Sequence, residues 1–254
     1  MMKLQDLFAE VVEQLEKLAE KEASKKRIAW FQQQHKGSEV KCYGIKTPQV
    51  RKLIRGYSER FQHLGLQERF DLAIMFYKSG FFEQATVGNA LLELSNESIT
   101  PDSFDSLDKV VGCFSNWASV DRLCLHVIQP LLLKYRAETL SLLKKWNSSK
   151  NMWKRRASIV AFVWKIGSSG EFTDTVLEFC ENLIWDKEDL VLKGVGWALR
   201  DSMNGDKDRI IKYVKSLRRR GVSSRVTLYA IENLKGEERK AILAIKPGNK
   251  SSQR

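Results

Sequence analysis

The chain has 254 residues, of which 43 are Lys or Arg and 31 are Asp or Glu, so its formal net charge is +12. Hydrophobic residues make up 43% of the sequence, against only 15 glycines and 4 prolines. This composition excludes an intrinsically disordered chain, a collagen-like chain and a disulfide-rich scaffold. The excess of positive charge indicates a strongly anionic partner, and nucleic acid is the first to consider.

Nothing in the sequence suggests a membrane protein, a secreted protein or a metalloprotein. Residues 1–21 lack the order of a signal peptide, and no apolar run approaches the roughly 20 residues of a membrane span, so we expect a cytoplasmic protein. The cysteines lie singly in apolar segments and the three histidines are scattered, so we expect small core residues and no metal. The cysteines are Cys42, Cys113, Cys124 and Cys180.

Taken in chain order, the segments show the three-or-four spacing of apolar residues that is typical of amphipathic helices. Helix starts are expected where a capping residue or a helix-opening proline precedes such a segment. They fall at Thr47-Pro48, Thr100-Pro101, Asn151 and Asp189, and turns are expected at Gly221 and Gly236. The pattern predicts an all-α protein of about a dozen helices.

A weak internal period suggests how these helices are arranged. Trp117, Arg156 and Trp197 are 39 and 41 residues apart, close to the period of HEAT and armadillo helix pairs. We therefore predict an α-α superhelix of HEAT-like repeats, in which equivalent positions line one concave face. Residues 1–245 would form this single domain, and residues 246–254 a disordered basic tail.

Positive charge is concentrated near the C-terminus. Residues 201–254 contain 14 Lys and Arg residues against 6 Asp and Glu residues. Cations at the end of a helix can simply be solvated and favoured by the helix dipole, but the size of the excess favours a surface that binds phosphates. The residues proposed for it are Arg218, Arg219, Arg220 and Arg225.

Three helical stripes combine an aromatic ring with a charged group. Trp117 and Asp121 are four residues apart, and Arg156 follows Trp153 by three, so each pair shares a helix face. The third stripe contains Lys193, Trp197 and Arg200.

Two glycines lie within the third stripe, at positions 194 and 196. A glycine inside a helix costs about 1 kcal/mol relative to alanine, which indicates that another backbone or a ligand comes close there.

Each stripe also has a purely structural interpretation. A helical tryptophan is usually a core residue, and this is what we expect of Trp30, Trp146, Trp164 and Trp185. Trp117 and Trp197 share their stripes with charged groups, which a buried stripe does not tolerate unpaired, so we expect them on a binding face. An ion pair between Asp121 and Arg156 would give both a structural role, and spacing alone does not decide this.

Five segments, taken in order, resemble the successive motifs of the bacterial AlkD family of DNA alkylation-repair glycosylases, over roughly residues 25–245. They are Tyr43-Gly-Ile-Lys-Thr-Pro-Gln-Val-Arg51, Asn116-Trp-Ala-Ser-Val-Asp121, Met152-Trp-Lys-Arg-Arg-Ala157, Lys193-Gly-Val-Gly-Trp-Ala-Leu-Arg200 and Tyr229-Ala-Ile-Glu-Asn-Leu234. Each motif is weak alone, and their common order makes the match specific.

The resemblance implies a monomeric enzyme that hydrolyses the N-glycosidic bond of N3- or N7-alkylated purines in double-stranded DNA, with no cofactor and no metal. Asp121 matches the catalytic carboxylate, and Trp117 and Trp197 match the aromatic pair that lines the lesion site. Arg156 and Arg200 match cations of the cleft.

Two positions depart from the family's pattern. Trp30 stands where the family usually has Tyr, so the ring is kept and a hydroxyl is lost. By this match Trp30 is assigned to the lesion site as a third aromatic residue. Ala118 stands where the family commonly has Asp, beside the first tryptophan of the pair. The residues to which we assign DNA binding are Arg156, Lys193, Arg200, Arg218, Arg219, Arg220 and Arg225.

Other function classes remain open at this point. A helical-repeat protein that binds distorted or branched DNA without acting on it would not need Asp121. A HEAT-type protein scaffold would present an apolar or acidic groove, which the charge of +12 opposes.

Overall fold

The structure is a computed structural model that describes residues 4–35 and 38–246. In these ranges it consists of helices and turns, with one isolated β-bridge between Lys41 and Phe81 and no strand. The predicted all-α fold class is confirmed. No helix in the described ranges is both long and apolar enough to cross a membrane.

The chain divides into two compact units, residues 1–139 and 140–254, which are described separately. The single domain expected over residues 1–245 stays a prediction. The tail expected at residues 246–254 lies, apart from Lys246, outside the described residues.

The first unit contains nine α-helices, one 3-10 helix and one π-helix within its described residues. They are α1 (Leu4–Lys17), α2 (Lys21–Gln34), α3 (Thr47–Gly56), α4 (Ser58–Gln62), α5 (Leu66–Lys78), α6 (Phe82–Leu94), η1 (Pro101–Ser103), α7 (Phe104–Gly112), α8 (Trp117–Leu123), η2 (Cys124–Ile128) and α9 (Gln129–Lys134).

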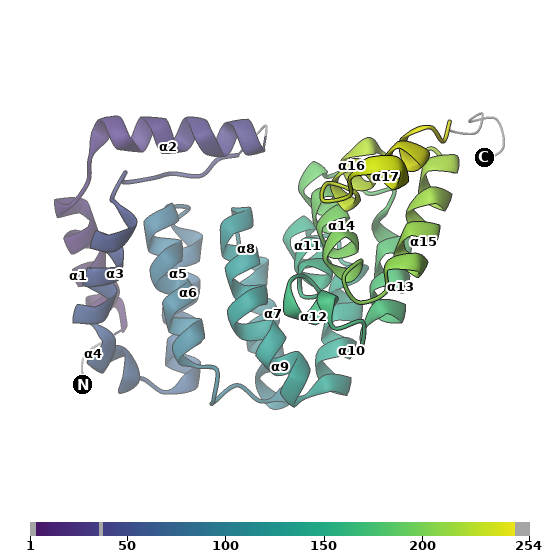
Figure 1. Cartoon of the computed structure of the whole chain (residues 1–254). Coiled ribbons are helices and arrows are strands. Elements are labelled where there is room, and N and C mark those ends of the chain that lie inside the picture. The colour runs from purple at the N-terminus through teal and green to yellow at the C-terminus, as the bar shows by residue number, and fades with distance from the viewer. Residues whose placement is uncertain (1–3, 36–37, 247–254) are drawn as a thin grey trace. The chain divides into compact units, whose positions relative to one another are not determined.

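The centre of the first unit is the pair formed by α5 and α6. Only three residues separate the two helices, and Gly80 adopts a left-handed φ of 76° in this turn, so the chain reverses and the helices pack side by side (Figure 1). Phe70 and Phe76 of α5 and Leu91 of α6 are fully buried. Figure 1 shows α2 running crosswise to this pair.

The described residues of the second unit contain eight α-helices, of which α10 begins shortly before the division. They are α10 (Arg136–Asn147), α11 (Met152–Val160), α12 (Lys165–Ser168), α13 (Thr173–Leu183), α14 (Asp189–Ser202), α15 (Lys207–Arg219), α16 (Ser224–Ala230) and α17 (Gly236–Leu243). Helix α14 packs against α11, α13 and α16 and is the central element of this unit (Figure 1).

The two glycines of α14 mark close approaches between helices. A Cβ atom at position 196 would lie 2.7 Å from Cβ of Tyr229 and 2.9 Å from the carbonyl oxygen of Val226, both in α16. A Cβ atom at position 194 would lie 3.2 Å from the side chain of Ile159 in α11. Of the two explanations offered by the sequence, close packing of a neighbouring helix is therefore confirmed.

The predicted helix starts are confirmed. Pro48 lies in the first turn of α3, and Pro101 opens η1 just before α7. Asn151 caps α11, because its side chain accepts the backbone N–H of Trp153 at 2.8 Å. Asp189 begins α14. The helices outnumber the dozen expected because short elements such as α4, α12 and η2 interrupt longer helical runs.

The prediction of core tryptophans is right for Trp146, which is fully buried, and wrong for three others. Trp30 is 44% exposed, Trp164 54% and Trp185 53%. Trp164 and Trp185 lie in turns after α11 and α13, where helical periodicity no longer tells which way a side chain points. Trp30 lies on α2, which fully buries only Phe31.

The prediction of core cysteines is confirmed for three of the four and wrong for Cys113. Cys42, Cys124 and Cys180 are buried, whereas Cys113 is partly exposed. Burial raises the pKa of Cys42 to about 12, so this group is a neutral thiol at physiological pH. It therefore contributes to packing rather than to chemistry.

Candidate functional site

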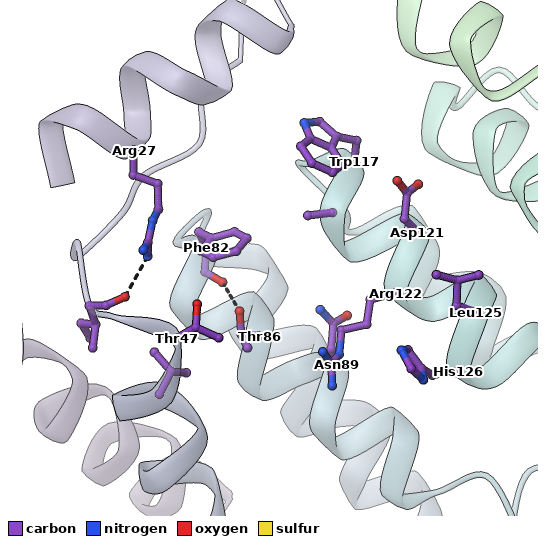
Figure 2. Close-up of a pocket in the computed structure, with 13 residues that line it drawn as sticks. Arg27, Thr47, Phe82, Thr86, Asn89, Trp117, Asp121, Arg122, Leu125 and His126 are labelled. Atoms are coloured by element: carbon purple, nitrogen blue, oxygen red, sulfur yellow. Dashed lines mark hydrogen bonds between the residues drawn. The ribbon is translucent and has the colours of Figure 1, made fainter. Parts of the chain in front are cut away.

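Helix α8 places Trp117 and Asp121 on one face. The Oδ1 atom of Asn116 accepts the N–H of Ser119 at 2.9 Å, so the helix is capped and begins at Trp117. Asp121 follows one turn later, and both side chains are partly exposed. The shared face expected from their spacing is present (Figure 2).

Both residues line a pocket of about 290 Å³ that lies within the first unit. Helices α2, α3, α6 and η2 supply the other walls, and Arg27, Phe82, Asn89, Arg122 and His126 contribute side chains (Figure 2). A volume near 300 Å³ is at the lower end for small-molecule sites. The pocket can therefore admit a group the size of one base or sugar.

Aromatic rings cluster around Trp117. The ring of Trp30 lies 5.4 Å from that of Trp117, and the ring of Phe31 lies 5.9 Å from Trp117. Trp30, Phe31 and Phe82 also line a neighbouring hollow, together with Lys26 and Arg27. Two of the three aromatic residues predicted for the lesion site thus meet beside the helix that carries Asp121.

The indole nitrogens of Trp117 and Trp197 are buried donors with no acceptor among the described residues. An unsatisfied buried donor costs about 1–3 kcal/mol, so such groups are uncommon in folded proteins and often mark functional sites. A bound group or water that supplies an acceptor would recover this free energy.

A buried carboxylate holds α2 in place. Glu83 of α6 is fully buried and accepts hydrogen bonds from the N–H groups of Tyr43 (2.9 Å), Gly44 (3.0 Å) and Ile45 (3.2 Å). It also pairs with Arg27 of α2 at 2.8 Å. Glu83 therefore fixes the chain that follows α2 and, through Arg27, the helix that carries Trp30.

Glu83 and Arg27 were not predicted as site residues, although Glu83 has a visible signal. It is the one charged residue of the largely apolar segment 81–92, and a charge that is buried requires a partner. The partner, Arg27, is 56 residues away in the chain and no local pattern identifies it.

The helical run that carries Asp121 continues through an irregular turn. In η2 the N–H of Gln129 donates to the carbonyl of Cys124, five residues earlier. Pro130 has no N–H to offer the carbonyl of His126, and the Nδ2 atom of Asn96 donates to that carbonyl at 2.6 Å. The π turn begins three residues after Asp121, and its residues Leu125 and His126 both line the pocket.

The arginines of the pocket are paired with glutamates. Arg27 pairs with Glu83, and Arg122 pairs with Glu93 through two of its side-chain nitrogens, Nε and Nη2. Their charges are balanced and their positions fixed, so they shape the wall of the pocket.

In the second unit, α14 presents Trp197 and Arg200. The guanidinium carbon of Arg200 lies 5.9 Å from the ring centre of Trp197 and 5.2 Å from that of Tyr229. Its Nε atom donates to Asp201 and its Nη1 atom to Glu232, each at 3.0 Å. Lys193, one turn before Trp197 in the helix, is partly exposed. Arg200 is thus a rigid cation set between two aromatic rings.

Arg156 has different surroundings. It is 4% exposed, and its Nη1 atom donates to the backbone carbonyl of Leu190 near the start of α14. Its role in DNA binding stays a prediction, and its burial favours indirect support of the site over contact with phosphates.

The basic residues of α15 and α16 are also largely engaged. Arg218 donates to the carbonyl of Leu243, Arg220 pairs with Glu181, and Arg225 pairs with Asp189. Arg219 is exposed and has no ion pair within residues 4–35 and 38–246. Arg225 is exposed as well but is paired, so among the four predicted phosphate contacts Arg219 is the exposed residue without an ion pair in the described ranges.

Comparison with known proteins agrees with these observations. The family model described as DNA alkylation repair enzyme matches residues 11–234. A solved structure of a predicted DNA alkylation repair enzyme from Enterococcus faecalis superposes with a TM-score of 0.70. The superposition covers 85% of this chain and 96% of that chain at 17% sequence identity, which shows a common fold. Curated proteins provide no match. Because the family model spans most of the sequence, the chain belongs to the DNA alkylation repair enzyme family.

Proposed function

We propose that the protein is a DNA glycosylase of AlkD type, which hydrolyses the N-glycosidic bond of cationic N3- or N7-alkylated purines in duplex DNA and so initiates base excision repair. One observation carries this proposal. Asp121 lies one helical turn from Trp117 on the wall of the same pocket, and the ring of Trp30, which lines the neighbouring hollow, lies 5.4 Å from that of Trp117. A carboxylate beside an aromatic surface suits a reaction in which positive charge develops.

The chemistry requires little from the protein. Alkylation at N3 or N7 makes the purine cationic, so the base departs neutral with the bonding electrons and needs no general acid. The sugar then acquires oxocarbenium character, as in glycoside hydrolysis. Asp121 would stabilise that cation and orient or deprotonate the attacking water, which adds to C1′.

The aromatic residues would recognise the charge of the lesion. A cation over an indole face is stabilised by about 0.5–2 kcal/mol. Trp30 and Trp117, whose rings lie 5.4 Å apart, would take this role in the first unit, and we assign the same role to Trp197 in the second. Arg200, held between Trp197 and Tyr229, would contact the DNA backbone, and Lys193 and Arg219 would add phosphate contacts.

The proposal is for a monofunctional, monomeric enzyme. Cleavage of the DNA strand requires an amine nucleophile at the sugar, and no lysine lines the pocket that contains Asp121. We keep the cytoplasm, which the sequence led us to expect, as the proposed location of the protein.

Replacement of Asp121 by Asn tests the assignment. The change removes the charge and keeps the shape, so excision is expected to fall by about 10² to 10³ while affinity for DNA is kept. The measurement is single-turnover release of the base from a methylated duplex, with spontaneous depurination subtracted. Asp105→Asn, at an exposed position in the first turn of α7, is the matched control and should leave excision unchanged.

The outcomes separate the competing hypotheses. Wild-type release at the spontaneous rate, with DNA binding intact, would favour a protein that binds distorted or branched DNA without acting on it. Full activity in Asp121→Asn would keep the enzyme and reject this residue. Loss of folding in the variant, seen by melting, would support the structural ion pair with Arg156.

A further inference from the structure

Trp164 combines two features that are unusual together. Its side chain is 54% exposed, and its backbone has φ 55° and ψ −129°. It is the one non-glycine residue with positive φ within the described ranges. These angles are close to those of the first central position of a type II′ turn, where glycine is strongly preferred. Folding alone would therefore favour glycine at this position.

The turn is held by the end of α14. The backbone N–H of Trp164 donates to Oδ2 of Asp201 at 2.7 Å, and Asp201 is buried. On the other side of the turn, a Cβ atom at Gly167 would lie 2.4 Å from the carbonyl oxygen of Phe162 and 3.3 Å from the backbone nitrogen of Ser202. Close packing on both sides fixes the backbone of Trp164 in this conformation.

The same carboxylate also positions Arg200. Oδ1 of Asp201 accepts Nε of Arg200 at 3.0 Å, while Oδ2 accepts the N–H of Trp164. Arg200 in turn lies over Trp197. One buried carboxylate thus binds both the backbone of Trp164 and the guanidinium of Arg200, and the exposed residue Lys165 follows Trp164 directly.

The charge of the second unit identifies the partner. Residues 140–254 contain 24 Lys and Arg residues against 13 Asp and Glu residues, a net charge of +11, whereas residues 1–139 contain 19 against 18. An exposed aromatic group in a strongly basic unit suits a nucleic acid, because aromatic rings pack on nucleotides and cations neutralise phosphates.

We propose that Trp164 is a further DNA-contacting residue, whose indole packs against a nucleotide of the bound duplex and positions the DNA beside Arg200 and Trp197. The proposal rests on the DNA-binding part of the proposed function and is independent of catalysis by Asp121. It accounts for a bulky, exposed side chain at a backbone position suited to glycine.

Trp164→Gly tests this proposal, because the substitution is expected to lower DNA affinity without lowering the stability of the fold. Glycine relieves the strained backbone, so the melting temperature is expected to stay the same or rise. Affinity for an unmodified duplex, measured by fluorescence anisotropy, is expected to fall on the order of tenfold. The slope of log affinity against log salt should not change, since the indole releases no counterion. Trp164→Phe should retain most of the affinity.

Trp185→Ala provides the matched control. Trp185 is 53% exposed in the same unit, but it precedes α14, whereas Trp164 is held at the end of that helix. The control should bind DNA like the wild type.

Unchanged affinity in Trp164→Gly would overturn the inference and leave the proposed function standing. Equal loss of affinity and of thermal stability would also overturn it, by showing a structural role. Failure of the wild type to bind duplex DNA would overturn both proposals.

Discussion

Trp30 and Phe31 are consecutive residues of α2 with very different surroundings. Phe31 is 1% exposed and packs with Val40 and Cys42, whereas Trp30 is 44% exposed and meets the ring of Trp117. The pair therefore separates a residue that stabilises the fold from one that is available to a ligand.

Alanine substitution of each should show this difference. Phe31→Ala is expected to lower the free energy of unfolding by about 3–5 kcal/mol, because it leaves a cavity in the core. Trp30→Ala should lower it by less than about 1 kcal/mol and reduce excision of cationic bases by about 2- to 30-fold through loss of a cation–π contact. Chemical denaturation and single-turnover base release measure the two effects. A large loss of stability in Trp30→Ala with normal excision would make Trp30 a structural residue.

Helices α13 and α15 are joined by a cluster around Glu181. Its carboxylate accepts hydrogen bonds from both Nη atoms of Arg220, at 2.5 and 3.0 Å, and from the hydroxyl of Tyr213 at 2.8 Å. The hydrogen bonds from Arg220 are the main cause that lowers the pKa of Glu181 below its ordinary value of 4.5. Arg220 thus connects two helices and is less available to phosphates.

This cluster predicts a pH dependence for Glu181→Gln. A carboxylate whose pKa is lowered in the folded state stabilises the fold above its ordinary pKa, and this stabilisation is lost as the pH falls through the folded value. The variant should melt below the wild type at pH 7, and the difference should shrink below about pH 4 and disappear in stronger acid. Thermal melting across this range provides the measurement. A difference that is constant with pH would mean that the charge of Glu181 does not stabilise the fold.

At the scale of the whole molecule, the two units differ in charge more than in construction. Both are built from short packed helices, yet the second carries nearly all of the net positive charge. Electrostatic attraction to DNA should therefore arise mainly from residues 140–254, while the carboxylate proposed for catalysis belongs to the nearly neutral first unit.

Charge reversal in each unit tests this division. Arg219→Glu is expected to weaken binding to all duplex sequences alike and to lower the slope of log affinity against log salt by about 0.9 for the lost phosphate contact. Lys109→Glu makes the same change of net charge at an exposed position in α7 and should have a smaller effect. Titrations at several salt concentrations provide the slopes. Equal slopes in the two variants would show that net charge alone matters.

Local patterns could be predicted from the sequence, and long-range partners could not. The caps of α8 and α11 and the shared face of Trp117 and Asp121 follow from spacing within a few residues. The backbone conformation of Trp164 is held by a hydrogen bond to Asp201, 37 residues away, and buried Arg156 donates to a carbonyl 34 residues away. Residue type and periodicity contain no information on contacts at such separations.

The attachment of α2 has a consequence for the order in which the protein folds and opens. Arg27 reaches Glu83 across 56 residues, and Trp30 meets Trp117 from further still, so α2 can gain these contacts only after α6 and α8 have formed. Since α2 fully buries a single side chain, it should be an early segment to detach and a late one to dock. Detachment would remove Trp30 from its contact with Trp117 while α8 keeps Asp121 in place.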